Sequence, residues 1–152
     1  MKKLCIITLS FIAIIFTSCN CEHESKNPVE GTWEMISSEW NSPDTTMVFQ
    51  KDDINKQLKI YTGKYYSWVH QRQINDSIKT HTTSGGAGMY TINGDTIVEI
   101  LEYFPWKSGV GYKSPLTFEI KGDTMIQHFP EMEDGPKDFQ GWTGTEVYIR
   151  VE

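Results

Sequence analysis

Glu99 and Gln127 occupy equivalent positions in two similar stretches of the chain. Each stretch alternates apolar and polar residues around an Ile-x-Gly-Asp-Thr segment, at residues 92–96 and 120–124. The alternation places both side chains on the bulkier, more aromatic face, which we assign to the interior. Because burying an unpaired carboxylate costs several kcal/mol, Glu99 needs a partner, a water molecule or a ligand. It is the residue whose chemistry most needs an explanation.

Aromatic and polar residues elsewhere extend this candidate site. On the stretch that contains Trp68, alternate residues share a face, so an inward Trp68 carries His70 with it towards one end of the domain. An aromatic lining with a few polar groups is typical of a small-molecule site. The candidate ligand-binding residues are Trp68, His70, Glu99, Tyr103, Gln127 and Tyr148. The same residues also fit a packed core whose polar atoms bond one another, and the sequence leaves both interpretations open.

Other chemistries find less support in the residue types and their spacing. His70 and His128 have no closely spaced Asp or Glu partner, and the alternation puts them on opposite faces, so we predict no metal site. The sequence has no Gly-x-Ser-x-Gly, no phosphate-binding loop and no cysteine in a nucleophile context. We therefore predict a binding protein, with no cofactor and no assigned catalytic residue. A hydrolase or isomerase centred on Glu99 is kept as an alternative.

The N-terminus has the features of an export signal. Lys2 and Lys3 precede an apolar run over residues 4–16, which is too short to span a bilayer permanently. The segment Phe16-Thr17-Ser18-Cys19 is similar to a lipobox, where bacterial lipoproteins are cleaved and acylated. We predict a signal peptide over residues 1–18, lipid attachment at Cys19, a polar tether over residues 19–28, and a domain over residues 29–152. The protein is expected at the outer membrane or cell surface.

The net charge limits the expected binding partners, and the cysteine content limits how the fold can be stabilised. The net charge is −6, and removal of residues 1–18 takes away two lysines and no acid, which leaves −8. An acidic chain without a Lys/Arg cluster excludes nucleic acid as the expected partner and offers no polybasic membrane patch. Cys21 would remain as a lone thiol, so the fold must rest on its core rather than on a disulfide.

The elements that must position these residues are short strands. Asn93-Gly94 is typical of a tight hairpin turn, because both residues tolerate positive φ. Turn signals recur every eight to twelve residues, and no convincing helix is found. The sequence therefore predicts an all-β fold: an antiparallel up-and-down β-barrel of eight to ten strands. The predicted inward residues of the two hairpins are Tyr90, Ile92, Ile97, Glu99, Leu101, Tyr103, Leu116, Phe118, Ile120, Met125, Gln127 and Phe129.

Loop aromatics suggest a second kind of site. Trp106, Tyr112, Phe139 and Trp142 lie in two long loops. Exposed aromatic rings can stack on sugars or contact another protein. A surface module that binds glycan or protein through the Trp106 and Trp142 loops is therefore an alternative function. A purely structural role, in which these rings cap one end of the barrel, is also open.

The ordered strand segments resemble a known family. Gly31-Thr32-Trp33 on the first strand resembles the lipocalin Gly-x-Trp signature, and Arg150 resembles the arginine that covers this tryptophan. With the segments between them, the chain is similar to the bacterial lipocalin-like domain families found as small lipoproteins in Bacteroidetes. The resemblance implies structural roles for Trp33 and Arg150 and a lipocalin-like barrel with an internal cavity. It carries over no catalytic residue.

These observations lead to one expected function. The chain is expected to be a lipid-anchored, lipocalin-like protein of the cell envelope that binds a small apolar or amphipathic ligand in the barrel. Its expected partners are this ligand and, through the lipid, the membrane. An alternative role for Tyr148 and Arg150 is to hold a ligand carboxylate.

Overall fold

The computed structural model describes residues 27–75, 80–133 and 140–151, with only the backbone described at 73–75, 80 and 81. The predicted signal peptide, Cys19, most of the tether and Phe139 lie outside these residues. The elements in chain order are β1 (Gly31–Asn41), β2 (Thr46–Gln50), β3 (Lys56–Thr62), β4 (Tyr65–Asn75), β5 (Thr80–Asn93), β6 (Thr96–Tyr103), the 3-10 helix η1 (Lys107–Gly109), β7 (Lys113–Lys121), β8 (Thr124–Phe129) and β9 (Thr143–Arg150).

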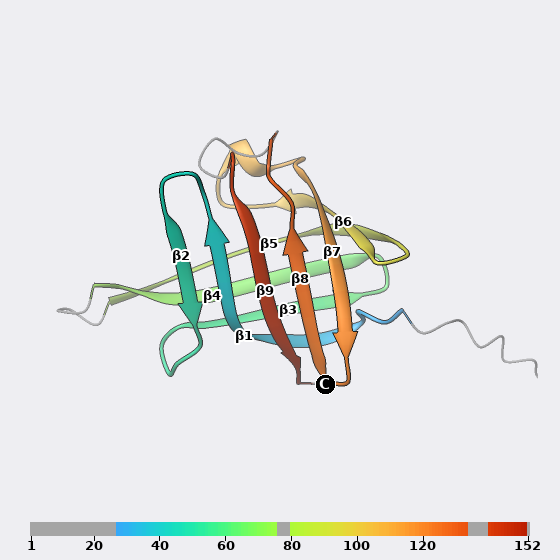
Figure 1. The fold of residues 1–152 in the computed structure, drawn as a ribbon, viewed down its shortest axis with the longest axis horizontal. Coiled ribbons are helices and arrows are strands. Elements are labelled where there is room, and N and C mark those ends of the chain that lie inside the picture. The colour runs from blue at the N-terminus through green and yellow to red at the C-terminus, as the bar shows by residue number, and fades with distance from the viewer. Residues whose placement is uncertain (1–26, 76–79, 134–139, 152) are drawn as a thin grey trace, which may run out of the picture.

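The strands form a closed antiparallel barrel. Each strand from β3 to β8 pairs with the next one along the chain, and β1 pairs with both β3 and β9. The second strand, β2, pairs with β1 alone, so it lies outside the ring of eight. Figure 1 shows β3–β6 crossing behind β1, β7, β8 and β9 at a steep angle. The prediction of an all-β, up-and-down barrel of eight to ten strands is confirmed.

Three tight turns gather at one end of the barrel. They join β3 to β4, β5 to β6 and β7 to β8, and each contains a glycine with positive φ: Gly63, Gly94 and Gly122. The opposite end carries the longer connections between β6 and β7 and between β8 and β9. The barrel therefore has a tightly turned end and a looped end. Within the described residues, no helix is long and apolar enough to cross a membrane.

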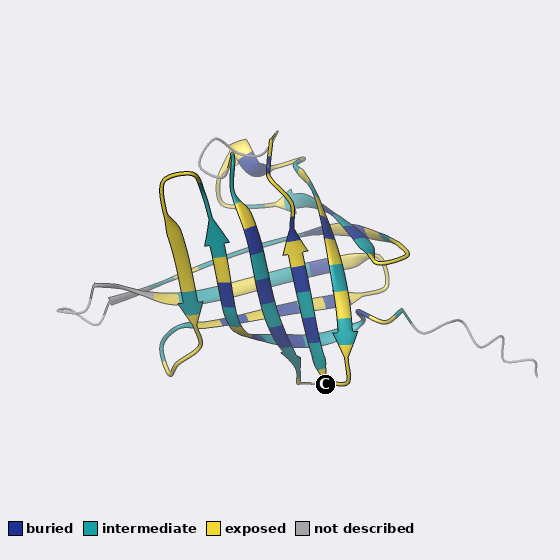
Figure 2. Cartoon of the chain, in the orientation of Figure 1, coloured by how far each residue is buried: buried dark blue, intermediate teal, exposed yellow. Residues whose placement is uncertain are grey.

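Burial follows the alternation of the strands, with the inward residues dark in Figure 2. Both hairpins have the predicted register, with Ile92 opposite Ile97 and Ile120 opposite Met125. The predicted inward faces are correct for both hairpins apart from one residue, Tyr103, which is 70% exposed.

A β-bulge explains the error at Tyr103. Gly88 pairs with Leu101 but Ala87 pairs with Tyr103, so Glu102 is one extra residue on β6. Inserting one residue reverses the face of everything beyond it. Gly88 makes the bulge possible, because a Cβ there would clash with the carbonyl oxygen of Ile100.

The tightly turned end is sealed around Trp33. Its ring is fully buried, and its Nε1 donates to the carbonyl oxygen of Val29 at 2.7 Å. The Arg150 guanidinium lies over the ring, 4.0 Å from its centroid, and donates to the carbonyl oxygens of Pro28 and Glu30 at 3.0 and 2.5 Å. The segment before β1 is thereby tied across the end of the barrel.

Candidate functional site

A buried ion pair lies in the middle of the barrel. Lys59 Nζ and Glu99 Oε1 are 2.8 Å apart, and their side chains are only 3% and 6% exposed. Lys59 also donates to Gln127 Oε1 at 2.9 Å, and the Tyr61 hydroxyl donates to Glu99. Gln127 Nε2 in turn donates to the Tyr61 hydroxyl at 2.8 Å. Glu99 therefore has a cationic partner inside the protein.

The sequence of β3 explains why a lysine is inside. Gln57, Lys59 and Tyr61 point inward and are buried, whereas the apolar Leu58 and Ile60 between them point outward. Hydrophobicity alone predicts the reverse face, which is why we missed Lys59. The inward direction of Lys59 could have been inferred from its cross-strand partner. Lys59 pairs with Trp68, and residues opposite each other share a face.

A second polar group extends the cluster towards the looped end. The Tyr148 hydroxyl donates to Glu146 Oε2 at 2.6 Å and accepts from Gln57 Nε2 at 2.9 Å. Burial raises the pKa of Glu146, and Lys59 and the Tyr148 hydroxyl act in the opposite direction. Burial, with the charge of a neighbouring carboxylate, also raises the pKa values of Tyr61 and Tyr148. Both tyrosines stay neutral hydrogen-bond donors at physiological pH.

Aromatic rings surround the ammonium group. Lys59 Nζ lies 5.5 to 6.0 Å from the ring centroids of Tyr61, Tyr66, Phe129 and Tyr148. Rings at this distance attract a cation, and they also exclude water. The polar groups of this cluster thus bond one another, as the packed-core interpretation of the sequence supposed. The role of Glu99, Gln127 and Tyr148 in ligand binding stays a prediction.

Glu146 gives the barrel a predicted pH dependence. Because burial raises its pKa, the folded state holds the proton more tightly than the unfolded state, whose usual value is 4.5. The stabilisation is complete below that value and is lost as the pH rises through the raised pKa. We expect Glu146 to contribute a negative slope to the free energy of unfolding against pH, measured in urea from pH 4 to 8 as the difference between the wild-type protein and Glu146→Gln. Glu146→Gln should remove this contribution and exposed Glu131→Gln should keep it; an equal slope in all three proteins would contradict the assignment.

A different set of residues forms a hollow in the wall near the looped end. It has a volume of ≈ 410 Å³, is open to solvent, and is lined by Trp68, Val69, Gly85, Gly86, Ala87, Tyr103, Phe104 and Pro105. Glycines make room for the indole: a Cβ at Gly86 would lie 3.0 Å from Trp68 Nε1. The run of small residues on β5 therefore leaves an apolar floor beside aromatic side chains.

Polar groups lie next to this hollow. The ring centroids of Trp68 and His70 are 5.4 Å apart, and burial, followed by the charge of Arg72, lowers the pKa of His70. His70 is therefore neutral at physiological pH and can both donate and accept. Ser84, directly opposite His70 on β5, has a buried hydroxyl without a hydrogen-bond partner in the described parts of the chain.

The aromatic loop after β6 continues from the hollow. The rings of Phe104 and Trp68 are 6.2 Å apart, and those of Phe104 and Trp106 are 5.0 Å apart in an edge-on arrangement. Trp106 is 58% exposed, whereas Trp142 on the other long loop is only partly exposed. The two loop tryptophans therefore differ in how much ring they offer to a partner.

The structure thus divides the six predicted ligand-binding residues into two groups. Glu99, Gln127 and Tyr148 belong to the buried cluster, with Lys59 as the partner we missed. Trp68 and Tyr103 line the hollow, and His70 lies beside Trp68. A second hollow of ≈ 230 Å³, over β7 and β8, includes none of the six. Within the described residues, no three His, Cys, Asp or Glu side chains converge to hold a metal.

Two solved structures from Bacteroides species resemble this chain. A lipocalin-like protein from Bacteroides uniformis ATCC 8492 is 16% identical, with a TM-score of 0.44, covering 80% of this chain and 97% of that one. An uncharacterized protein from Bacteroides eggerthii DSM 20697 is 14% identical, with a TM-score of 0.46, covering 80% and 98%. No family model and no curated protein matches the sequence. Membership of a lipoprotein family stays a prediction.

Proposed function

We propose that the protein is exported, anchored by a lipid on Cys19, and binds a small amphipathic molecule at the hollow beside Trp68. The volume of ≈ 410 Å³ falls within the range of small-molecule sites, and the lining is apolar and aromatic as in such sites. His70, whose ring lies beside that of Trp68, is the polar side chain next to the lining of the hollow. The hollow is the observation that carries the proposal, and the lipobox-like segment supports the anchor.

The hollow supports binding at the wall rather than deep in the barrel. Fully buried side chains, among them Tyr61, Tyr148 and Gln127, occupy the interior. The Glu99 carboxylate is bound by Lys59 and Tyr61 and lines neither hollow. An enzyme centred on Glu99 therefore gains no support, because a substrate would first have to displace these partners.

Glycan binding through Trp106 is the second candidate. Its exposed ring touches Phe104, which also lines the hollow, so a sugar stacked on Trp106 would lie beside the same site. Trp106→Ala distinguishes the two candidates, because it removes the stacking ring and leaves the hollow.

Ligand capture tests the proposal directly. We expect native mass spectrometry of protein purified from its own envelope to show a bound small molecule. Trp68→Ala should weaken its binding at least about tenfold, because the ligand loses an aromatic wall. Trp142→Ala, in the other loop, is the matched control and should retain it. A wild-type protein that carries no ligand and binds none from envelope extracts would refute ligand binding.

Acylation is tested separately. Cells grown with a palmitate analogue should label the wild-type protein, and Cys19→Ser should abolish the label. Labelling that survives this substitution would refute Cys19 as the anchor.

A further inference from the structure

The outer surface of β3–β6 is apolar although it faces solvent. Five of its large side chains are 37% to 58% exposed: Leu58, Ile60, Tyr65, Val69 and Met89. We call this surface the outer wall. Soluble domains rarely leave a large contiguous apolar patch exposed without a partner for it.

Strand pairing makes the outer wall continuous. Leu58 lies opposite Val69, Ser67 lies between Ile60 and Ala87, and Tyr65 lies opposite Met89. Cross-strand neighbours on one face of a sheet are in contact distance. The hollow belongs to the same surface, because Val69, Ala87 and Tyr103 line it. The apolar residues thus form one patch rather than scattered single positions.

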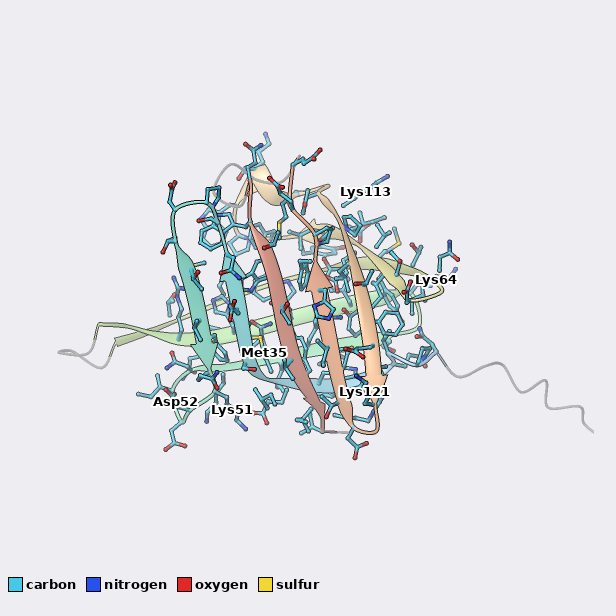
Figure 3. All side chains as sticks on the ribbon, viewed as in Figure 1. Met35, Lys51, Asp52, Lys64, Lys113 and Lys121 are labelled. Atoms are coloured by element: carbon cyan, nitrogen blue, oxygen red, sulfur yellow. The ribbon has the colours of Figure 1, made fainter. Side chains whose placement is uncertain are left out.

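The charge of the outer wall differs from that of the whole chain. The chain carries a net charge of −6, yet the described outward positions of β3, β4 and β5 hold no Asp or Glu. Lys56, Lys64 and Lys113 lie at its borders, and Figure 3 shows the last two projecting away from the barrel. The acids beside it include Glu102 at the bulge, Glu34 on β1, which is bound to Lys51, and Glu30, which accepts from the Gly63 backbone nitrogen.

We infer that the outer wall docks on the surface of a lipid bilayer. Tyrosine and tryptophan prefer the boundary between acyl chains and headgroups, and Tyr65, Tyr103 and Trp106 are all more than half exposed on or beside the outer wall. Bordering lysines face lipid phosphates, to which each contributes about 1 kcal/mol near an anionic surface. An apolar face with basic and aromatic borders matches the requirements for interfacial binding.

The position of the N-terminal segment favours this occupant. The described chain begins at Asn27, which donates to the Tyr90 hydroxyl at 2.6 Å. Glu30 accepts from the backbone nitrogen of Gly63 at 2.8 Å, so the segment lies beside the turn that carries Lys64. Seven residues lie between Cys19 and Asn27, and the eight residue-to-residue steps span at most about 28 Å. A lipid on Cys19 would therefore hold the outer wall within reach of the bilayer, so the inference rests on the proposed anchor.

Docking would also give the hollow a source of ligand. With the outer wall on the bilayer, Tyr103 and the hollow open towards the lipid rather than towards bulk water. An amphipathic molecule could then move between membrane and hollow without crossing the aqueous phase.

Site-directed fluorescence on vesicles tests the docking. Cys21→Ser removes the thiol that would remain after the predicted cleavage and the acylation of Cys19. A polarity-sensitive dye is then attached to Ser67→Cys, in the centre of the outer wall, or to Glu119→Cys, an exposed position on β7. The acylated proteins are reconstituted on vesicles of phosphatidylcholine and phosphatidylglycerol. We expect blue-shifted, severalfold brighter emission from position 67 and water-like emission from position 119.

A non-acylated chain separates this inference from the anchor. The mature chain with Cys19→Ser should still sediment with the anionic vesicles. The double variant Ile60→Ser/Val69→Ser, in this chain, should partition about tenfold more weakly, because two apolar side chains no longer enter the interface. A wild-type protein that is not acylated in cells, with vesicle binding of the non-acylated chain retained, would refute the anchor alone. Water-like emission from the dye at position 67, or no sedimentation with the vesicles, would overturn docking on the bilayer. Docking would also be overturned if envelope proteins, and not lipid, shielded the dye at position 67 from water.

Discussion

Replacing Lys59 with methionine should lower the free energy of unfolding by about 3–5 kcal/mol. The side chain is nearly fully buried, and its ammonium group is 2.8 Å from Glu99 and 2.9 Å from the Gln127 amide oxygen. Methionine fills a similar volume but leaves the Glu99 carboxylate without its cation. Breaking a buried ion pair is costly because the remaining charge stays desolvated. Urea unfolding followed by tryptophan fluorescence measures the loss.

The chain contains a matched control for this substitution. Lys51 and Glu34 form an ion pair of nearly the same length, 2.7 Å, but their side chains are 37% and 26% exposed. Lys51→Met should therefore cost no more than about 1 kcal/mol, because water can solvate Glu34 when its partner is removed. The difference between the two variants isolates the effect of burial from that of the contact itself.

A double variant identifies the cause of the loss. Lys59→Met/Glu99→Gln removes both charges and keeps an acceptor for the Tyr61 hydroxyl, so it should recover a large part of the stability. If Lys59→Met were as mild as Lys51→Met, or if the double variant were no better than the single one, the stranded carboxylate would not be the cause.

The hairpins could be predicted from the sequence because their signals are local. Asn93-Gly94 and the second Ile-x-Gly-Asp-Thr segment fix the turns, and the alternation on either side fixes the face. The same register carried Glu99 and Gln127 into the interior, where both are buried. The pairing of β1 with β9, which closes the barrel, joins the two ends of the domain, so no local signal predicts it. Only the resemblance of Trp33 and Arg150 to a known signature indicated this pairing.

The partner of Glu99 could not be predicted with the same method. Lys59 is flanked by Leu58 and Ile60, so a hydrophobicity pattern turns β3 inside out. The lysine is buried because four aromatic rings and two carboxylates share the same interior, a condition that involves β3, β4, β6, β8 and β9 together. The prediction that Tyr103 faces inward was wrong for a different reason. The extra residue Glu102, opposite Gly88, reverses its face, and alternation contains no sign of a bulge.

Trp33→Ala should lower the free energy of unfolding by about 3–5 kcal/mol, as expected for a fully buried ring. The substitution removes the ring under Arg150, and it removes the donor to the Val29 carbonyl oxygen, so the segment before β1 loses one of its hydrogen bonds. Thermal or urea unfolding measures the loss. Arg150→Met keeps the ring covered by an apolar chain but gives up two hydrogen bonds to backbone carbonyls, and it should cost less than Trp33→Ala.

The functional consequence of the same substitution is the stronger test of how the barrel is organised. Trp33 lies at the tightly turned end, whereas the hollow beside Trp68 lies at the looped end. Trp33→Ala should therefore leave ligand affinity unchanged at temperatures where the variant is folded. Trp68→Ala, in contrast, should weaken ligand binding. A Trp33→Ala protein that is folded but no longer binds the ligand would show that the two ends are not independent. The ligand would then have to extend through the barrel interior rather than rest in its wall.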